Sequence, residues 1–254
     1  MRIRILLYLL LFPVLLSAQP YAVRQLGIGK GLSNNYVVSI AQDKEGFLWF
    51  ATEEGLNKFD GTRFITYYKN ETEDGYGITG NELNHLLDDP EDSVLWIGTQ
   101  RTGLNAYDYA NDTFTIYRHS DTIPESLITD DVTHIAAASD GNLWIATYWK
   151  GIDYLDKATG HFTHYNKETV PELVSDNIWS VADGGNGKLY IGHVHHGFSV
   201  FSVREKRVKN FMHDPADPNS LPGNEVRCVY KDSNNNIWVG TNRGIALYLS
   251  LIHI

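Results

Sequence analysis

Short apolar runs separated by turn-forming residues recur along most of the chain. The residues Leu48, Trp49 and Phe50 are apolar at consecutive positions, so both faces of the strand that contains them must be covered. β-Branched and aromatic residues, bounded by Asp, Glu and Gly, predict four strands in this first unit. We expect the four strands to form one antiparallel meander over 37–42, 47–52, 55–59 and 64–68.

The unit repeats five times. The aromatic position at Trp49 recurs at steps of 47, 48, 46 and 48 residues, and a Gly followed by an apolar residue comes shortly after each copy. Repeats of this length whose sheets are apolar on both faces are typical of the blades of a β-propeller. The sequence predicts an all-β chain of about five four-stranded blades in an incomplete ring, near 32–68, 78–117, 127–165, 173–211 and 221–248.

Two sets of recurring positions have simple structural interpretations. The aromatic residues Trp49, Trp96, Trp144 and Trp238 are expected to fill the core between neighbouring blades. Each unit also begins with a short segment of polar and small residues, which we call the leader segment and interpret as the connection between blades. The leader segments are assigned to 32–35, 78–81, 128–131, 174–177 and 221–224.

The two ends of the chain differ from the repeats. Residues 1–18 have two arginines, a 12-residue apolar run at 5–16 and small residues before Gln19, the pattern of a secretory signal peptide. The run is shorter than the roughly 20 residues that span a bilayer. We expect residues 19–248 to form the propeller and 249–254 to be a tail foreign to the native sequence, because the fifth blade stops before its last strand.

Charge and cysteine content limit the function further. Loss of Arg2 and Arg4 with the signal peptide changes the formal net charge from −10 to −12, which argues against nucleic acid and anionic lipid as partners. Cys228 is the only cysteine, so no disulfide can form within the chain. We interpret Cys228 as a small buried residue of the strand that begins at Val226.

The repeats resemble those of the two-component regulator propeller family. The resemblance lies in a leader such as 32–35, a strand that ends in Asp43, and the run from Gly46 through Leu48 and Trp49 to Thr52, and it extends over 32–248. It implies that the chain is the periplasmic sensor region of a hybrid two-component histidine kinase of Bacteroidetes, and that it is part of a propeller of seven blades.

The same resemblance implies features that lie outside this sequence. They are further blades, a β-sandwich, a membrane-spanning helix, and kinase, receiver and DNA-binding domains. The protein would contact the membrane only through that helix. The resemblance also implies a homodimer in the full-length protein, a periplasmic location for this part, and no enzymatic activity in this chain.

A ligand site is expected where the second and third strands of each blade meet. These hairpins are equivalent in every blade, so they should form one rim, and their residues vary between copies. Aromatic side chains there could stack on a sugar ring, and basic ones could bind hydroxyl, uronic acid or sulfate groups. The candidate residues are Trp149, Tyr148, Lys150, Arg101, His195, His196 and Arg243. The alternative is that these are only solvated turns.

Other chemistry has weaker support in the sequence. His193, His195 and His196 are close together, but neighbouring strand residues point to opposite faces, so we expect no metal site and no cofactor. Acidic pairs such as Asp88 and Asp89 fall in connections and are not expected to be catalytic. We therefore expect a sensor that binds an oligosaccharide or another small periplasmic ligand. The alternatives are a secreted propeller lyase or glycosidase that acts on polysaccharide, and a non-catalytic scaffold.

Overall fold

The computed structural model describes residues 23–70 and 77–249, and almost all of its regular structure is β-strand. One short 3₁₀ helix, η1 (Ile28–Lys30), precedes the strands. Blade 1 contains β1 (Val37–Gln42), β2 (Leu48–Thr52), β3 (Gly55–Phe59) and β4 (Phe64–Tyr67), and blade 2 contains β5 (Leu83–Asp89), β6 (Val94–Thr99), β7 (Leu104–Asp108) and β8 (Thr113–Tyr117).

Blade 3 contains β9 (Val132–Ala137), β10 (Leu143–Thr147), β11 (Gly151–Asp156) and β12 (His161–Tyr165). Blade 4 contains β13 (Ile178–Gly185), β14 (Lys188–His193), β15 (Phe198–Ser202) and β16 (Arg207–Phe211). Blade 5 contains β17 (Val226–Lys231), β18 (Ile237–Thr241) and β19 (Gly244–Tyr248).

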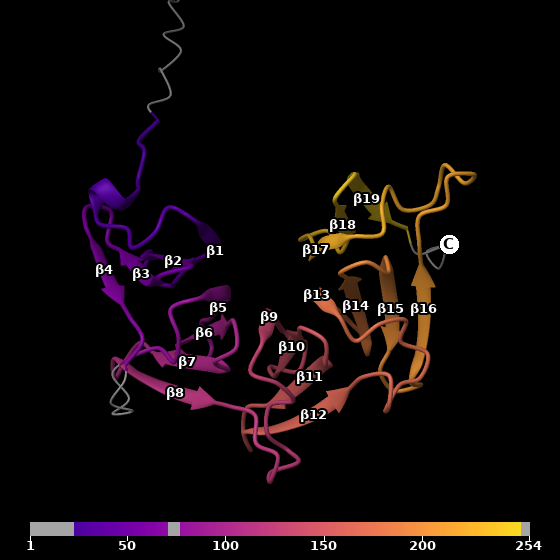
Figure 1. Ribbon diagram of the computed structural model, residues 1–254, viewed down its shortest axis with the longest axis horizontal. Coiled ribbons are helices and arrows are strands. Elements are labelled where there is room, and N and C mark those ends of the chain that lie inside the picture. The colour runs from indigo at the N-terminus through magenta and orange to yellow at the C-terminus, as the bar shows by residue number, and fades with distance from the viewer. Residues whose placement is uncertain (1–22, 71–76, 250–254) are drawn as a thin grey trace, which may run out of the picture.

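Each blade is a separate antiparallel sheet in chain order, with four strands in blades 1 to 4 and three in blade 5. The first strands of successive blades lie next to one another, on the concave side of an open arc (Figure 1). The predicted incomplete β-propeller is thus confirmed. The strand limits predicted for blade 1 differ from the structure only in that β2 begins at Leu48 and β4 ends at Tyr67.

Aromatic and aliphatic side chains fill the interface between each pair of neighbouring blades. We call this interface a seam. Trp49 is fully buried against Tyr107 and Tyr109 of the next blade, with ring centroids 5.1 and 5.8 Å apart. Trp96 and Trp144 are buried in the next two seams, as the sequence predicts. Trp238 is 39% exposed. Its prediction as a core residue was wrong in this structure, because no described blade packs on that face of blade 5.

A second set of contacts joins the first strands of neighbouring blades. Side chains at the third residue of these strands accept hydrogen bonds from the backbone of the next blade: Ser39 from Leu86, His85 from Ile135 and Ser180 from Val229, at 3.0–3.3 Å. Cys228 occupies the same position in blade 5 and is exposed. Its expected burial was wrong, since none of the strands that the structure describes covers it.

The leader segments hold consecutive blades in register. Asn81, Asp130, Asp176 and Asn224 occupy equivalent positions. The backbone carbonyl of each accepts a hydrogen bond from the glycine at, or immediately before, the start of the third strand of the preceding blade. Each side chain also accepts a backbone hydrogen bond, at 2.6–2.7 Å, from a residue just beyond the fourth strand of that blade. The leader segment therefore binds both the third-strand end and the fourth-strand end of the preceding blade.

This geometry corrects the predicted alignment of two leader segments. Leu127 and Leu173 are buried, as are Leu32, Ile78 and Leu221, which begin the other leaders. The third and fourth leaders thus start one residue earlier than the sequence interpretation placed them. The sequence pattern instead placed the next apolar residues, Ile128 and Val174, at the first position of these leaders.

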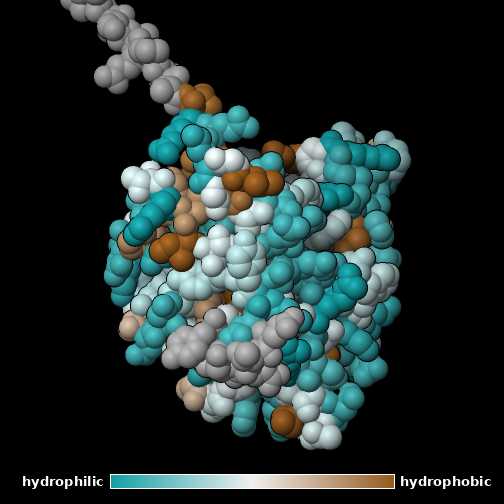
Figure 2. Space-filling view, turned by 60° about the vertical axis from the view of Figure 1, so that its left-hand side comes forward, coloured by the Kyte–Doolittle hydropathy of each residue, from teal (hydrophilic) through white to brown (hydrophobic). Residues whose placement is uncertain are grey.

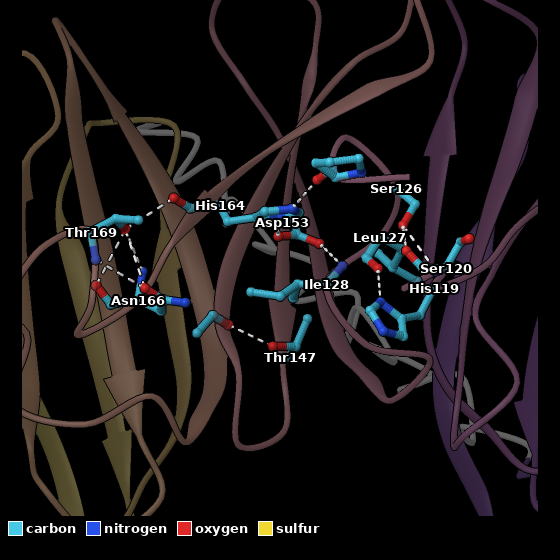
Figure 3. Close-up of polar contacts among 12 residues, drawn as sticks. His119, Ser120, Ser126, Leu127, Ile128, Thr147, Asp153, His164, Asn166 and Thr169 are labelled. Carbon is cyan, nitrogen blue, oxygen red and sulfur yellow. Dashed lines mark hydrogen bonds and ion pairs between the residues drawn. The ribbon is translucent and has the colours of Figure 1, made fainter. Parts of the chain in front are cut away.

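In blades 1 to 3, a buried polar residue of the third strand accepts a hydrogen bond from the leader segment of the same blade. Asn57 accepts from the Ser33 amide, and Asn105 from the Thr79 amide, both at 3.0 Å. In blade 3, Asp153 accepts from the Ile128 amide at 2.8 Å. Figure 3 shows this carboxylate between Ile128 and the His164 ring.

Two regions of the sequence predictions lie outside the described residues. The signal peptide assigned to 1–18 is one, and the tail at 249–254 is the other apart from Leu249. Within the described part of the chain, no helix is both long and apolar enough to cross a membrane. On the side that bears blade 1, hydrophobic patches interrupt a mostly hydrophilic surface (Figure 2). The exposed aliphatic residues of that blade include Val38, Ile40 and Ile65.

Candidate ligand-binding site

The hairpins between the second and third strands lie on the same face of the arc as the leader segments. The backbone amides of Gln100, Tyr148, Val194 and Asn242, at the start of four hairpins, donate to the residue before the first strand of their own blade at 2.9–3.2 Å. We call this face the hairpin rim. Its residues are therefore carried on a rigid set of β-hairpins next to the concave side.

Three of the seven predicted site residues line two separate hollows at the hairpin rim. Tyr148 lines a hollow of about 520 Å³ on the concave side. His195 and Arg243 line a smaller hollow of about 210 Å³ between blades 4 and 5. The sequence had treated all of the rim residues as one site, and the structure does not bring them together.

Trp149 is exposed at the tip of its hairpin, as predicted. Its side chain is 64% exposed, and its ring meets the Tyr148 ring edge to face with centroids 5.2 Å apart. Its backbone φ is 70°, and Arg101 has φ 67° at the equivalent position in blade 2. Arg101, rather than Thr102, is therefore the counterpart of Trp149. Lys150, Arg101 and His196 are likewise exposed.

The larger hollow is built from the concave side of the first strands, and we call it the axial hollow. The second residue of each first strand faces it, and this position carries a different side chain in every blade. Gln100 and Tyr148 from two hairpins, with Asp131, complete its upper part. The five strand residues are Val38, Asn84, Thr133, Trp179 and Arg227.

An arginine and a tryptophan form one wall of the axial hollow. The Arg227 guanidinium lies 4.6 Å from the centre of the Trp179 ring, a cation–π contact. Arg227 also forms an ion pair with Glu225, which fixes its direction. This wall presents an aromatic surface and a positioned set of N–H donors.

The opposite wall contains polar groups of blades 2 and 3. The Asn84 side-chain amide donates to the Val132 carbonyl at 2.8 Å, which holds it across the seam. Partial burial raises the pKa of Asp131, although Arg101 nearby opposes this shift. The axial hollow therefore combines hydrogen-bond acceptors on this wall with donors on the other.

Two histidines form the floor of the axial hollow. The rings of His85 and His134 are in contact, with centroids 3.9 Å apart and their planes tilted by 38°. Burial lowers the pKa of His85 to about 4, and burial together with His85 lowers the pKa of His134 well below its usual value. Both rings are thus neutral near pH 7. Because His85 Nδ1 accepts from Ile135, its proton is on Nε2.

The three neighbouring histidines in the fourth hairpin do not converge. His193 is fully buried, and its Nε2 is 2.7 Å from Ser199 Oγ, whereas His195 and His196 are exposed. Within the described residues, no group of three or more His, Cys, Asp or Glu side chains is placed to hold a metal ion.

Sequence reasoning missed Trp179, Arg227 and Asn84. The sequence does contain a signal for these residues, because the second residue of the first strand differs in every blade, whereas a purely structural position would keep one residue type. These residues are Val38, Asn84, Thr133, Trp179 and Arg227. Assigning the inward phase of the first strands would have identified it.

The fold and the axial hollow define the class of protein as a β-propeller with a ligand-sized opening on its concave side. A profile of two-component regulator propellers matches residues 31–54, 126–149 and 220–243, in blades 1, 3 and 5. The chain therefore carries two-component regulator propeller repeats.

Individual relatives point to signalling receptors. The chain is 55% identical to the extracellular domain of the hybrid two-component system BT3049 from B. thetaiotaomicron, with a TM-score of 0.85 over 92% of this chain and 31% of that one. The extracellular domain of BT4673 from the same bacterium is 23% identical with a TM-score of 0.66, over 85% of this chain and 28% of that one, and shows the fold.

Histidine kinase P4 from Formosa agariphila is a relative with a curated description. It is 28% identical over 223 residues, which are 84% of this chain and 12% of the kinase. The chain thus spans less than a third of the BT3049 domain and about an eighth of histidine kinase P4.

Proposed function

We propose that the chain is the ligand-binding propeller of an exported, periplasmic sensor of the hybrid two-component histidine kinase type. The likeness to the extracellular domain of BT3049 supports this proposal, since it extends over 92% of the chain at 55% identity. The role of the propeller is recognition. Catalysis would belong to a kinase domain elsewhere in the parent protein.

The ligand proposed for the axial hollow is an oligosaccharide. The observation that carries this proposal is the pairing of Trp179 and Tyr148, which offer aromatic surfaces, with Asn84, Asp131 and Arg227, which offer acceptors and donors in the same hollow. A sugar ring has apolar C–H faces and hydroxyls that both donate and accept, so it fits such walls. The volume of about 520 Å³ lies in the range of small-molecule sites.

Signalling requires that the ligand favour one arrangement of the receptor over another. The axial hollow meets side chains from all five blades, so a bound ligand would bear on the angles between blades. Binding would then shift the population of propeller arrangements that the rest of the receptor senses.

The test is binding of the chain without residues 1–18 to an array of neutral and acidic oligosaccharides, followed by calorimetry on the glycans retained. Trp179→Ala should weaken binding about tenfold, the effect of losing one good stacking contact. Trp149→Ala tests whether the exposed hairpin tip also contacts the glycan. Trp238→Ala, which removes an aromatic ring from the open face of blade 5, is the matched control.

Two results would contradict the proposal. One is a retained glycan whose affinity is the same in the wild-type and Trp179→Ala proteins, which would move the site elsewhere. The other is release of reducing ends or loss of viscosity when the purified chain is mixed with polysaccharide, which would favour an enzyme.

A further inference from the structure

A second hollow, distinct from the axial hollow, opens between blades 3 and 4 on the opposite face of the arc. It has a volume of about 430 Å³. We call it the seam hollow, and it is lined by Trp144, Tyr154 and Tyr165 of blade 3, with Asp140, Asp183 and Arg204 near its polar parts.

The seam hollow exists because blade 3 departs from the repeat at one position. In the other blades with a tryptophan, the indole N–H is capped by an aspartate of the same blade: Trp49 by Asp43, Trp96 by Asp89 and Trp238 by Asp232, at 2.8–3.4 Å. Ala138 stands in this place before Trp144. Alanine has no side-chain acceptor, so the aspartate cap found in the other three blades is absent from Trp144.

Blade 4 departs from the repeat at a second position in the same seam. In the first seam, Tyr109 covers Trp49 and donates to Asp88 at 2.8 Å. In the second, Lys157 covers the equivalent space and binds Asp89 at 2.6 Å. Blade 4 has Val203 at this position, which lines the hollow and leaves the space unfilled.

The polar groups of the seam hollow are fixed in direction. Asp140 accepts from the Tyr154 hydroxyl and from the Asn142 amide, and Asp183 accepts from the Ser139 and Gly185 amides at 2.5 and 3.1 Å. Partial burial works against ionisation, but the bonds from Tyr154 and Asn142 hold the pKa of Asp140 below its usual range. Asp140 is therefore an ionised acceptor near pH 7.

We propose that the seam hollow is a second binding site, and that it takes a single pyranose ring. Three aromatic side chains supply apolar walls for C–H groups. The Trp144 N–H and Arg204 can donate hydrogen bonds to a ligand, whereas the carboxylates of Asp140 and Asp183 have further lone pairs that can accept them. A sugar hydroxyl satisfies both, and an organic cation would leave the N–H donors unmatched.

The test is ligand-observed NMR of the chain without residues 1–18, with D-glucose, D-galactose, D-mannose and N-acetyl-D-glucosamine at about 1 mM, the weak end of biological affinities. The expected result is saturation transfer to at least one sugar, and a shift of the Trp144 indole N–H signal, assigned with Trp144→Phe. Tetramethylammonium serves as the cation probe.

Two substitutions restore the repeat and should close the site. Val203→Tyr places the ring that Tyr109 supplies in the first seam, and Ala138→Asp supplies the missing cap. Each should weaken sugar binding by about tenfold or more. Val23→Tyr adds the same ring at a position that is 95% exposed, and should change nothing. Thermal unfolding of each variant shows whether it is folded.

Three outcomes would overturn the proposal. They are no transfer to any of the four sugars, transfer to tetramethylammonium in preference to them, and sugar binding that Trp179→Ala abolishes while Val203→Tyr leaves it intact. The last result would place the sugar in the axial hollow. The two sites can therefore fail separately, because each has its own variant.

Discussion

The fully buried carboxylate of Asp153 lies 2.6 Å from His164 Nδ1, while His164 Nε2 lies 2.8 Å from the Pro124 carbonyl (Figure 3). Both partners of the ring are acceptors, so both ring nitrogens must carry protons. The Asp153 carboxylate accordingly raises the pKa of His164, and burial raises the pKa of Asp153. This ion pair holds the 124–128 connection against blade 3.

Stability should therefore fall as pH rises above neutrality. A histidine whose pKa is raised on folding contributes fully below its unfolded pKa of about 6.5, and the contribution is lost as pH rises through the folded value. We expect the melting temperature of the wild-type protein to decrease between about pH 6 and pH 9, and His164→Gln to flatten this decrease while lowering stability at pH 6.

His161→Gln is the control for this prediction, because His161 is exposed on the same strand. Its pH profile should match that of the wild type. A His164→Gln profile parallel to the wild-type profile would show that the ring is not protonated in the folded protein. Melting curves by circular dichroism at each pH suffice for the comparison.

Gly103, which immediately precedes the third strand of blade 2, should not tolerate a side chain. Gly103 has φ 91°, and a Cβ there would lie well inside van der Waals contact with the Tyr117 carbonyl oxygen. Gly61 has φ 94°, but a Cβ there would have no neighbour within 4 Å. Gly61→Ala should cost about 1–2 kcal/mol for the left-handed backbone alone, and Gly103→Ala about 3–5 kcal/mol. Urea unfolding compares them, and equal costs would show that the strand edge can relax.

The buried amide of Asn105 should contribute more to stability than its small size suggests. It accepts from the Thr79 amide at 3.0 Å and donates to Thr79 Oγ1 at 2.9 Å, with no solvent exposure. Asn105→Ala leaves these groups unsatisfied and should lower the free energy of unfolding by about 1–3 kcal/mol. Thr115→Ala, on the exposed side of β8, should change it by less than about 0.5 kcal/mol. A similar small effect for Asn105→Ala would mean that water replaces the amide.

The propeller could be predicted from sequence because its main determinant is periodic. Trp49, Trp96 and Trp144 recur at nearly constant spacing, and consecutive apolar residues require cover on both faces of each sheet. The off-by-one leader segments show the limit of this reasoning. Ile128 has the same residue type as the buried Ile78, and only the packing of Leu127 shows which apolar residue of the pair is buried.

The candidate sites were less accessible to sequence reasoning, because they depend on strand phase and on departures from the repeat. Trp179 and Arg227 face the axial hollow only because their strands turn that side inward. The seam hollow depends on Ala138 and Val203, because other blades have larger side chains at the equivalent positions. The sequence correctly predicted that the Trp149 side chain is exposed, but exposure alone does not show which ligand or residue it contacts.

The repeat should contribute unequally to stability at the two ends of the arc. Trp49 and Trp238 occupy the same position in blades 1 and 5, and each donates its indole N–H to an aspartate six residues earlier, at 2.8 and 2.9 Å. Trp49 is fully buried in a seam, whereas Trp238 is 39% exposed. Trp49→Ala should lower the free energy of unfolding by about 3–5 kcal/mol, because it leaves a cavity.

Trp238→Ala loses less buried area and leaves no enclosed cavity, so its cost should be about 1–2 kcal/mol. Both tryptophans make the same hydrogen bond to an aspartate. The difference in unfolding free energy between the two variants therefore measures the packing that a neighbouring blade supplies. Urea unfolding of the chain without residues 1–18 gives both values. If Trp238→Ala were as costly as Trp49→Ala, the outer face of blade 5 would be covered in solution.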